Sequence, residues 1–230
     1  MIFQQLFDEK SSTYTYVISS GEGREALIID PVIEHTEKYI KILENLKLKL
    51  VKVIDTHIHA DHITALNELN KRTNCARVMG ENSKSEVIDL KIKDDEKVKI
   101  ENIELKAMYT PGHTDCSYSY LMNDRVFTGD TLLINGTGRT DFQNGSSYDA
   151  YESLFNKLLK LPEKTLVYPA HDYNGKKFST IENEKNNNPR LQVKSKEEYA
   201  NIMENLNLAN PKMMDIAVPA NVKGLTLDQI

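Results

Sequence analysis

The feature that most constrains this chain is a dense run of metal-binding side chains near residue 60. The run reads Thr56-His57-Ile58-His59-Ala60-Asp61-His62, and it holds three of the six histidines. It follows directly on a strand-like segment, residues 48–54. Imidazole and carboxylate groups are ligands for Zn, Mn and Fe. Because a short loop at a strand end points its side chains at one spot, the sequence predicts a metal site there.

Three further metal-binding side chains follow strand-like segments later in the chain. His113 lies in the turn Thr110-Pro111-Gly112-His113-Thr114, Asp130 follows the apolar run 125–127, and His171 follows the run 165–167. Strand ends at one edge of a sheet bring distant parts of a chain together, so we expect these three residues to join the first run. His35 is the histidine outside this set, and we expect it on the surface at the start of a helix.

This series of residues resembles the ligand series of the metallo-β-lactamase superfamily, in the right order and over nearly the whole chain. The resemblance implies an α/β fold, the αββα sandwich of two mixed sheets flanked by helices, with the metal at one edge of the sheets. Asp30 matches an acidic residue that, in the superfamily, supports the metal loop without binding the metal. The superfamily includes lactamases, glyoxalase II, nucleases, flavin-linked oxygen reductases and sulfur dioxygenases, so the fold alone does not choose the function.

Composition narrows the class of protein. The length of 230 residues suits one α/β domain, and without an internal repeat or a linker we expect residues 1–230 to form it. A net charge of −5 argues against a nucleic-acid surface. Two cysteines cannot build a disulfide framework, which indicates a reducing compartment. We find no signal peptide and no membrane span, so we expect a cytoplasmic enzyme without nucleic-acid or membrane partners.

Hydrophobic periodicity predicts the secondary structure. Strands are expected over residues 2–7, 13–18, 26–30, 75–79, 103–109, 118–122 and 125–127, and helices over 36–46, 63–72, 148–161 and 196–208. Thr36 is the expected N-cap of its helix. The helix over 148–161 has the clearest apolar stripe, which comprises Tyr148, Tyr151, Leu154, Phe155, Leu158 and Leu159. The charged residues 81–102 are expected to form a solvated surface with an edge strand.

Several longer strings resemble one family within the superfamily, the persulfide dioxygenases. They are Gly138-Arg139-Thr140-Asp141-Phe142-Gln143, Pro169-Ala170-His171-Asp172-Tyr173, Asn188-Pro189-Arg190-Leu191 and Val218-Pro219-Ala220-Asn221. The resemblance implies an Fe(II)-dependent dioxygenase with one non-haem iron per chain and O2 as co-substrate. Such an enzyme oxidises glutathione persulfide, or a similar low-molecular-weight persulfide, to sulfite and the free thiol.

The same resemblance assigns roles to the metal-binding residues. His57, His113 and Asp130 become the iron ligands, a set of two histidines and one carboxylate that leaves three coordination positions free. The remaining members, His59, Asp61, His62 and His171, become hydrogen-bonding partners that hold the ligands and line the oxygen pocket. In glyoxalase II and the lactamases, the matching positions complete a two-metal site, so a second metal at these residues stays open.

Two residues are the candidates for binding the substrate. Arg139 offers a planar fork that can take a substrate carboxylate, although an ion pair with Asp141 is the alternative. Tyr173 can reach the pocket with its hydroxyl, although core packing is the alternative. Thr137 stands where many family members have cysteine, and Cys116 is either a buried apolar side chain or a redox group.

The alternative enzyme is a glyoxalase II-like thiolester hydrolase with a dinuclear site, in which a metal-bound hydroxide attacks the carbonyl. Glyoxalase II usually has cysteine where this chain has Gly112, and it has a longer helical C-terminal domain than residues 191–230 can form. A non-enzymatic metal or sulfur-carrier binding protein is a further alternative. For partners, the family resemblance suggests a homodimer and a functional link to a rhodanese, while the identity of the thiol carrier stays open.

Overall fold

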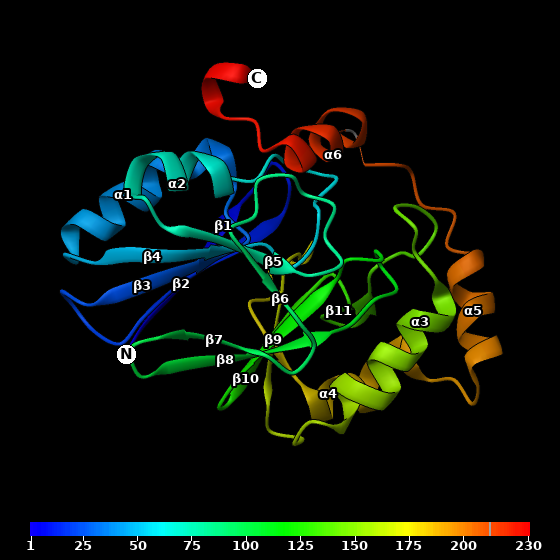
Figure 1. Ribbon diagram of the computed structural model, residues 1–230. Helices are drawn as coiled ribbons and strands as arrows, with labels where there is room; N and C mark the ends of the chain where they lie inside the picture. Colours follow the sequence, from blue (N-terminus) through cyan, green and yellow to red (C-terminus); the bar gives the residue numbers. More distant parts are fainter. Residues whose placement is uncertain (212) are drawn as a thin grey trace.

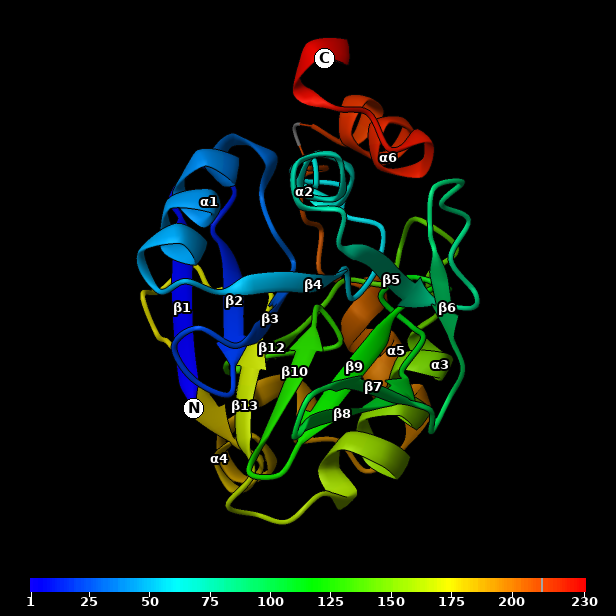
Figure 2. The ribbon, with the colours of Figure 1, turned by 60° about the vertical axis from the view of Figure 1, so that its left-hand side comes forward.

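Two six-stranded sheets pack face to face in the computed structural model, which describes residues 1–211 and 213–230 (Figure 1, Figure 2). The first sheet has the order β1 (Ile2–Asp8), β2 (Thr13–Ser19), β3 (Glu25–Ile29), β4 (Lys49–Ile54), β5 (Ala76–Gly80) and β6 (Leu90–Ile92). The second has the order β14 (Ser179–Thr180), β13 (Leu166–Pro169), β10 (Arg125–Gly129), β9 (Tyr118–Met122), β8 (Ile103–Tyr109) and β7 (Lys97–Ile100). Both sheets mix parallel and antiparallel pairs, as expected for the metallo-β-lactamase fold.

Helices cover the two outer faces of the sandwich (Figure 2). The first sheet carries α1 (Thr36–Asn45), α2 (Leu66–Thr73) and α6 (Met214–Lys223), and the second carries α3 (Ser147–Glu152), α4 (Ile181–Asn187) and α5 (Lys196–Glu204). A short hairpin of β11 (Leu132–Leu133) and β12 (Gly136–Thr137) follows β10. No helix among the described residues is long and apolar enough to cross a membrane.

Successive residues along a strand alternate between the core that separates the two sheets and the core beneath the outer helices. In β2, Tyr16 and Ile18 belong to the apolar cluster between the sheets, whereas Val17 belongs to the cluster under the helices of the first sheet. Because successive strand residues point to opposite faces, a strand that is apolar at every position is buried on both sides. The inner cluster is rich in aromatic rings, and Tyr16 contacts Phe127 with ring centroids 4.9 Å apart.

The structure departs from the sequence-based expectations mainly at helix ends. The helix expected over 63–72 begins at Leu66, because residues 63–65 pair instead with the segment after β3. Thr36 is not an N-cap: His35 holds that position, and the Thr36 hydroxyl donates to the carbonyl of Ile33. His35 is partly exposed, and its Nε2 lies 2.8 Å from Asp8.

The helix expected over 148–161 is helical but not uniform. It continues from α3 as a π-helical turn over Ser153–Lys157 and ends as a 3₁₀ turn over Leu158–Lys160. Leu154, Leu158 and Leu159 of the expected apolar stripe are buried, whereas Tyr148, in the first turn, is exposed. Residues 81–102 contribute two strands rather than one, since β6 and β7 form edges of different sheets. The helices α4 and α6 were not predicted.

A hydrogen bond from a buried tyrosine gives a test of how the two sheets are joined. Tyr16 is 1% exposed, and its hydroxyl donates to the carbonyl of Pro169 in the other sheet over 2.6 Å. Tyr16→Phe leaves that carbonyl without this partner, so we expect the free energy of unfolding to fall by about 1–2 kcal/mol. Urea denaturation measures this change.

Tyr120 supplies the matched control. It lies in the same inner cluster at 0% exposure, but its hydroxyl has no hydrogen-bond partner among the described residues. Tyr120→Phe therefore deletes the same oxygen without breaking a bond, and its stability should be unchanged or higher. Equal losses in the two variants would show that the bond from Tyr16 does not hold the sheets together.

Candidate metal centre

Four strands end at the same edge of the sandwich and deliver the predicted residues to one place. In the second sheet, β8 and β10 both pair antiparallel with β9, and β13 runs parallel to β10, so the ends of all three point the same way. His113 follows β8, Asp130 follows β10 and His171 follows β13, while the metal loop, residues 57–62, follows β4 in the first sheet. The predicted convergence is therefore present.

Three of these residues form a compact group. One ligand atom from each of His57, His113 and Asp130 lies within 4.8 Å of the others. His113 Nε2 is 3.6 Å from Asp130 Oδ2, which is longer than a hydrogen bond. The two imidazole rings are almost perpendicular, with centroids 5.0 Å apart. This spacing leaves room for an ion between the three side chains.

A backbone carbonyl fixes the tautomer of His113. Its Nδ1 lies 2.7 Å from the carbonyl oxygen of Arg139, which can only accept a hydrogen bond. The ring therefore carries its proton on Nδ1 and keeps a lone pair on Nε2, the atom that faces Asp130. This arrangement is typical of a histidine that binds a metal through one nitrogen and is oriented through the other.

His57 is oriented in the same way through Thr56. The Thr56 hydroxyl donates to Asp30 Oδ2 over 3.0 Å, so it can accept from His57 Nδ1, also at 3.0 Å. Asp30 further accepts from the Thr56 backbone amide and lies 3.1 Å from His59 Nε2. Asp30 thus supports the metal loop, as expected. Burial lowers the pKa of His57, which favours the neutral ring that a metal ligand requires.

The donor set of this group suits a divalent transition metal. It offers two imidazole nitrogens with free lone pairs and one carboxylate oxygen. Although burial alone would raise the pKa of Asp130, the charge and the hydrogen bond of His171 hold that pKa well below its usual range, so the carboxylate is ionised. Two histidines and one carboxylate on one side of an ion leave positions open for reactants.

His171 is held between two carboxylates. Its Nδ1 lies 2.7 Å from Asp130 Oδ1, and its Nε2 lies 2.9 Å from Asp61 Oδ2. Although burial alone would lower the pKa of His171, Asp130 and Asp61 raise it well above its usual range. Both ring nitrogens therefore face acceptors. His171 acts here as a bridge between Asp130 and the metal loop.

A second group lies beside the first. One ligand atom from each of His59, Asp61 and His62 lies within 4.8 Å of the others. His59 Nδ1 and His62 Nε2 are buried, with no hydrogen-bond partner among the described residues. Asp61 Oδ2 is shared by His62 Nδ1 at 2.9 Å and His171. The two imidazole nitrogens are free to bind, but Asp61 is already engaged.

Gly138 packs against two residues of the group formed by His57, His113 and Asp130. A Cβ at Gly138 would lie 2.1 Å from the carbonyl oxygen of Asp130 and 2.9 Å from the ring of His113. Both distances are far inside normal contact, so the β11–β12 hairpin can reach this position only without a side chain. Gly138 therefore lets the hairpin pack directly against two residues of the candidate centre.

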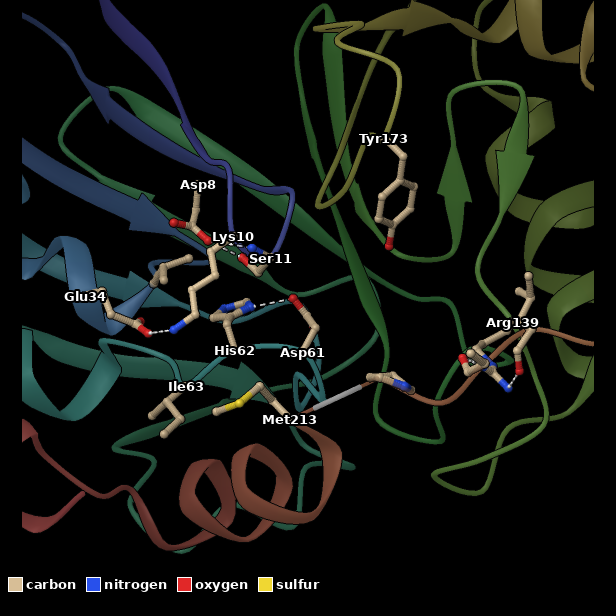
Figure 3. Close-up of a pocket in the computed structure, with 14 residues that line it drawn as sticks. Asp8, Lys10, Ser11, Glu34, Asp61, His62, Ile63, Arg139, Tyr173 and Met213 are labelled. Atoms are coloured by element: carbon tan, nitrogen blue, oxygen red, sulfur yellow. Dashed lines mark hydrogen bonds and ion pairs between the residues drawn. The ribbon is translucent and has the colours of Figure 1, made fainter.

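Two adjoining cavities open from the centre. The inner one, about 140 Å³, is lined by His113, Asp130, His171 and Arg190 among others. The outer one, about 680 Å³, shares Asp61, Arg139 and Tyr173 with it. Figure 3 shows the outer cavity, with Tyr173 and Arg139 on one side and Lys10, Glu34 and His62 on the other. The centre therefore opens into a space that suits a small molecule.

Arg139 forms the ion pair with Asp141 that the sequence offered as the alternative to substrate binding. Its Nε and Nη2 each bind a carboxylate oxygen of Asp141 at 2.6 Å. The same guanidinium donates to the carbonyls of Leu208 and Ala209, and it lies over the ring of Phe142. Its fork is thus paired within the chain, and a substrate carboxylate would have to compete with Asp141 for it.

Three other candidates are now placed. Tyr173 is 72% exposed and lines both cavities, so it is not a core residue. Cys116 is buried in the cluster under the first sheet, and burial raises the pKa of its thiol, which disfavours the reactive thiolate. Thr137 is buried, with its hydroxyl 2.9 Å from that of Tyr199.

Two residues at the site, Arg190 and Thr13, were not predicted from the sequence. Arg190 lines the inner cavity and donates to the carbonyl of Thr137, and it has no carboxylate partner among the described residues. Its string Asn188-Pro189-Arg190-Leu191 carries part of the family resemblance, but the sequence alone assigns Arg190 no role. Thr13 lies in β2, far from any motif, and its hydroxyl is 3.0 Å from His171 Nε2.

Comparison with known proteins agrees with this geometry. The model of the metallo-beta-lactamase superfamily matches residues 9–171. The mouse protein named Persulfide dioxygenase ETHE1, mitochondrial, is 42% identical over 97% of this chain and 88% of its own length. The crystal structure of ETHE1 from Myxococcus xanthus superposes with a TM-score of 0.94 at 49% identity, over 96% of this chain and 98% of that one.

A more distant relative represents the other enzyme class. The hydroxyacylglutathione hydrolase of Dictyostelium discoideum is 32% identical over 76% of this chain and 68% of its own length. Both the lower identity and the shorter match separate it from the first two proteins.

Gly138→Ala tests the packing behind the centre. The added methyl group would clash with Asp130 and His113, and overpacking of this kind costs about 1–3 kcal/mol of stability. We also expect the variant to bind metal less tightly, because one of the two residues must move. Thermal unfolding and metal content after dialysis measure the two effects.

The control variant is Gly136→Ala in the same hairpin. A Cβ at Gly136 meets no atom closer than 3.9 Å, so both stability and metal content should stay near those of the wild type. If Gly136→Ala and Gly138→Ala change stability and metal content equally, the close packing of Gly138 does not support the metal centre.

Proposed function

We propose that this chain, which belongs to the persulfide dioxygenase family of the metallo-β-lactamase superfamily, is an Fe(II) enzyme that oxidises a low-molecular-weight persulfide with O2. Glutathione persulfide is the expected substrate, and sulfite and glutathione are the expected products. In the balanced reaction, the persulfide, one O2 and one water give sulfite, the free thiol and two protons. The terminal sulfur is oxidised and O2 is reduced.

The observation that carries this proposal is the orientation of three donor atoms. The hydrogen bonds of Thr56 and Arg139 engage Nδ1 of His57 and His113 and leave Nε2 for a metal, and one ligand atom of each ring lies within 4.8 Å of Asp130, which borders the inner cavity. Iron bound at these residues would supply open coordination positions and would pass electrons from the persulfide sulfur to O2. The protein supplies the orientation of the ligands and the shape of the pocket.

The same network supports one metal rather than two. A dinuclear site needs a group that joins the two ions, and Asp130 is the side chain between the two groups. Its Oδ1 is bound to His171 Nδ1, and the other nitrogen of His171 is bound to Asp61. These charge-assisted bonds are among the stronger hydrogen bonds in proteins, and His171 could join His59 and His62 around a second ion only by breaking them.

Arg190 is our candidate for binding a carboxylate of the thiol carrier. Its guanidinium is partly buried in the inner cavity, where burial lowers the pKa of Arg190 and no carboxylate compensates the charge. A partly buried cation that has a carbonyl but no carboxylate partner among the described residues favours an anionic ligand. Tyr173 borders the same cavity and can direct its hydroxyl toward the substrate. Arg139, already paired with Asp141, would instead position the segment around Leu208.

The thiolester hydrolase is the second candidate, and one observation favours it. The unpaired nitrogens of His59 and His62 are where a second metal of a dinuclear hydrolase would bind. The assembly of a homodimer, a functional link to a rhodanese and a cytoplasmic location stay predictions from the sequence.

The direct test of the proposed function uses protein reconstituted anaerobically with Fe(II). We expect O2 uptake and sulfite release with glutathione persulfide, and no lactate release from S-lactoylglutathione. His113→Ala should lose iron and activity together, because a set of three ligands does not hold iron when one imidazole is gone. Iron analysis and an oxygen electrode provide the two readouts.

His35→Ala is the matched histidine control, since His35 bonds to Asp8 outside the metal groups. It should keep both iron and activity. An active, iron-loaded His113→Ala protein would overturn the ligand assignment, and thiolester turnover without O2 uptake would favour the hydrolase.

Arg190→Ala tests the substrate site. Loss of a charged hydrogen bond is worth about 1.5–3 kcal/mol, so KM for the persulfide should rise roughly ten- to a hundred-fold with iron content unchanged. Arg139→Ala should raise KM less, because its charge is already neutralised by Asp141. Steady-state kinetics on samples with equal iron content compare the two increases in KM. A larger increase in Arg139→Ala than in Arg190→Ala would show that Arg139 binds the substrate carboxylate.

A further inference from the structure

The helix α6 packs directly on the metal loop, although the two segments are far apart in the chain (Figure 1, Figure 2). Its buried residues Ala217 and Ala220 belong to the same apolar cluster as Ile58 and Ile63, which lie within and just after the loop. This contact brings the string Val218-Pro219-Ala220-Asn221, which has no role in the reaction described above, next to the candidate centre.

Asn221 reaches from this helix into the loop with its whole side-chain amide. Its Oδ1 accepts from the backbone amide of Thr64 over 2.9 Å. Its Nδ2 donates to the carbonyls of His59, at 2.9 Å, and His62, at 3.0 Å. Asn221 itself is only 5% exposed. One buried side chain thus bonds to three backbone groups within a six-residue stretch.

These backbone groups have few other sources of hydrogen bonds. Between β4 and α2, the chain has no helix or strand, and Thr64 makes an isolated bridge with Val32. A buried carbonyl or amide without a partner costs free energy comparable to a lost hydrogen bond. The loop can therefore keep this irregular path inside the protein because Asn221 satisfies its backbone.

The end of α6 that carries Asn221 is held by contacts with residues 86 and 87. The backbone amide of Glu86 donates to the carbonyl of Val222 over 2.9 Å. The helix then ends at Gly224, whose φ of +65° allows the left-handed turn, and a Cβ there would lie 2.5 Å from Val87. The amide of Asn221 is thus held on a rigid support rather than on a free helix end.

We propose that Asn221 is a positioning residue for the metal centre: it holds the loop in the path that places His57 at the metal and His59 and His62 beside it. Docking of α6 and retention of the metal are then coupled. The proposal rests on the proposed metal site at His57, His113 and Asp130. It needs no change of protonation and no contact between Asn221 and the substrate.

The test compares three full-length variants. Asn221→Ala removes all three bonds, and Asn221→Asp keeps nearly the same shape but loses both donors and places a carboxylate against two carbonyls. Val218→Ala, on the same helix and packed on the same cluster, removes apolar contact but keeps all three hydrogen bonds of Asn221 to the loop. Iron release to a chelator is measured on the loaded proteins, and deuterium uptake of residues 57–65 on the metal-free ones.

Both Asn221 variants should release iron about tenfold faster than the wild type, a typical loss for residues that support metal ligands. Both should also take up deuterium faster in residues 57–65, whereas Val218→Ala should match the wild type in both readouts even where its melting temperature falls. If Asn221→Asp folds and keeps wild-type release and uptake, the proposal is wrong.

The two readouts separate this proposal from the proposed function. If the wild type takes up no iron, the metal assignment fails, but deuterium uptake in the metal-free variants still tests the hold of Asn221 on the loop. If the wild type binds iron and Asn221→Ala releases it no faster than Val218→Ala does, the positioning role alone is refuted.

Discussion

The pairing of His171 with two carboxylates joins the parts of the candidate centre. Through Asp130 it reaches the end of β10, and through Asp61 it reaches the metal loop after β4. The two sheets of the sandwich therefore meet at one imidazole. Because both of its nitrogens are engaged, His171 is removed from the set of free ligands, and Asp130 keeps one oxygen for the group with His57 and His113. The number of metals that the site favours follows from this arrangement.

The direction of each remaining imidazole depends on a partner from elsewhere in the chain. Asp30 after β3 orients His57 through Thr56, the carbonyl of Arg139 orients His113, and Asn221 in α6 fixes the path of the loop. These partners act on backbone or on the nitrogen away from the metal. A site built in this way is preorganised before any ion enters, which lowers the cost of ordering it on binding.

The parts of the fold and of the site that could be predicted are those encoded in short stretches of sequence. The metal-binding residues stand in short motifs after strands, and the strand alternation is visible in the sequence, so their convergence was predictable. The role of Arg139 was not, because its choice of Asp141 over a substrate depends on the fold of the loop. The π turn over Ser153–Lys157 and the helix α6, which contains Pro219, depend on tertiary packing that no local pattern reports.

The account is tested most directly by counting the iron that the metal-free protein binds. Anaerobic equilibrium dialysis against Fe(II), followed by metal analysis and X-ray absorption, gives both the stoichiometry and the ligand types. The account predicts one tightly bound iron per chain with two imidazole nitrogens and one carboxylate oxygen among its ligands. Two tightly bound irons per chain at a short mutual distance would contradict it, because the account keeps His171 bonded to Asp130 and Asp61 and so withholds it from a second ion.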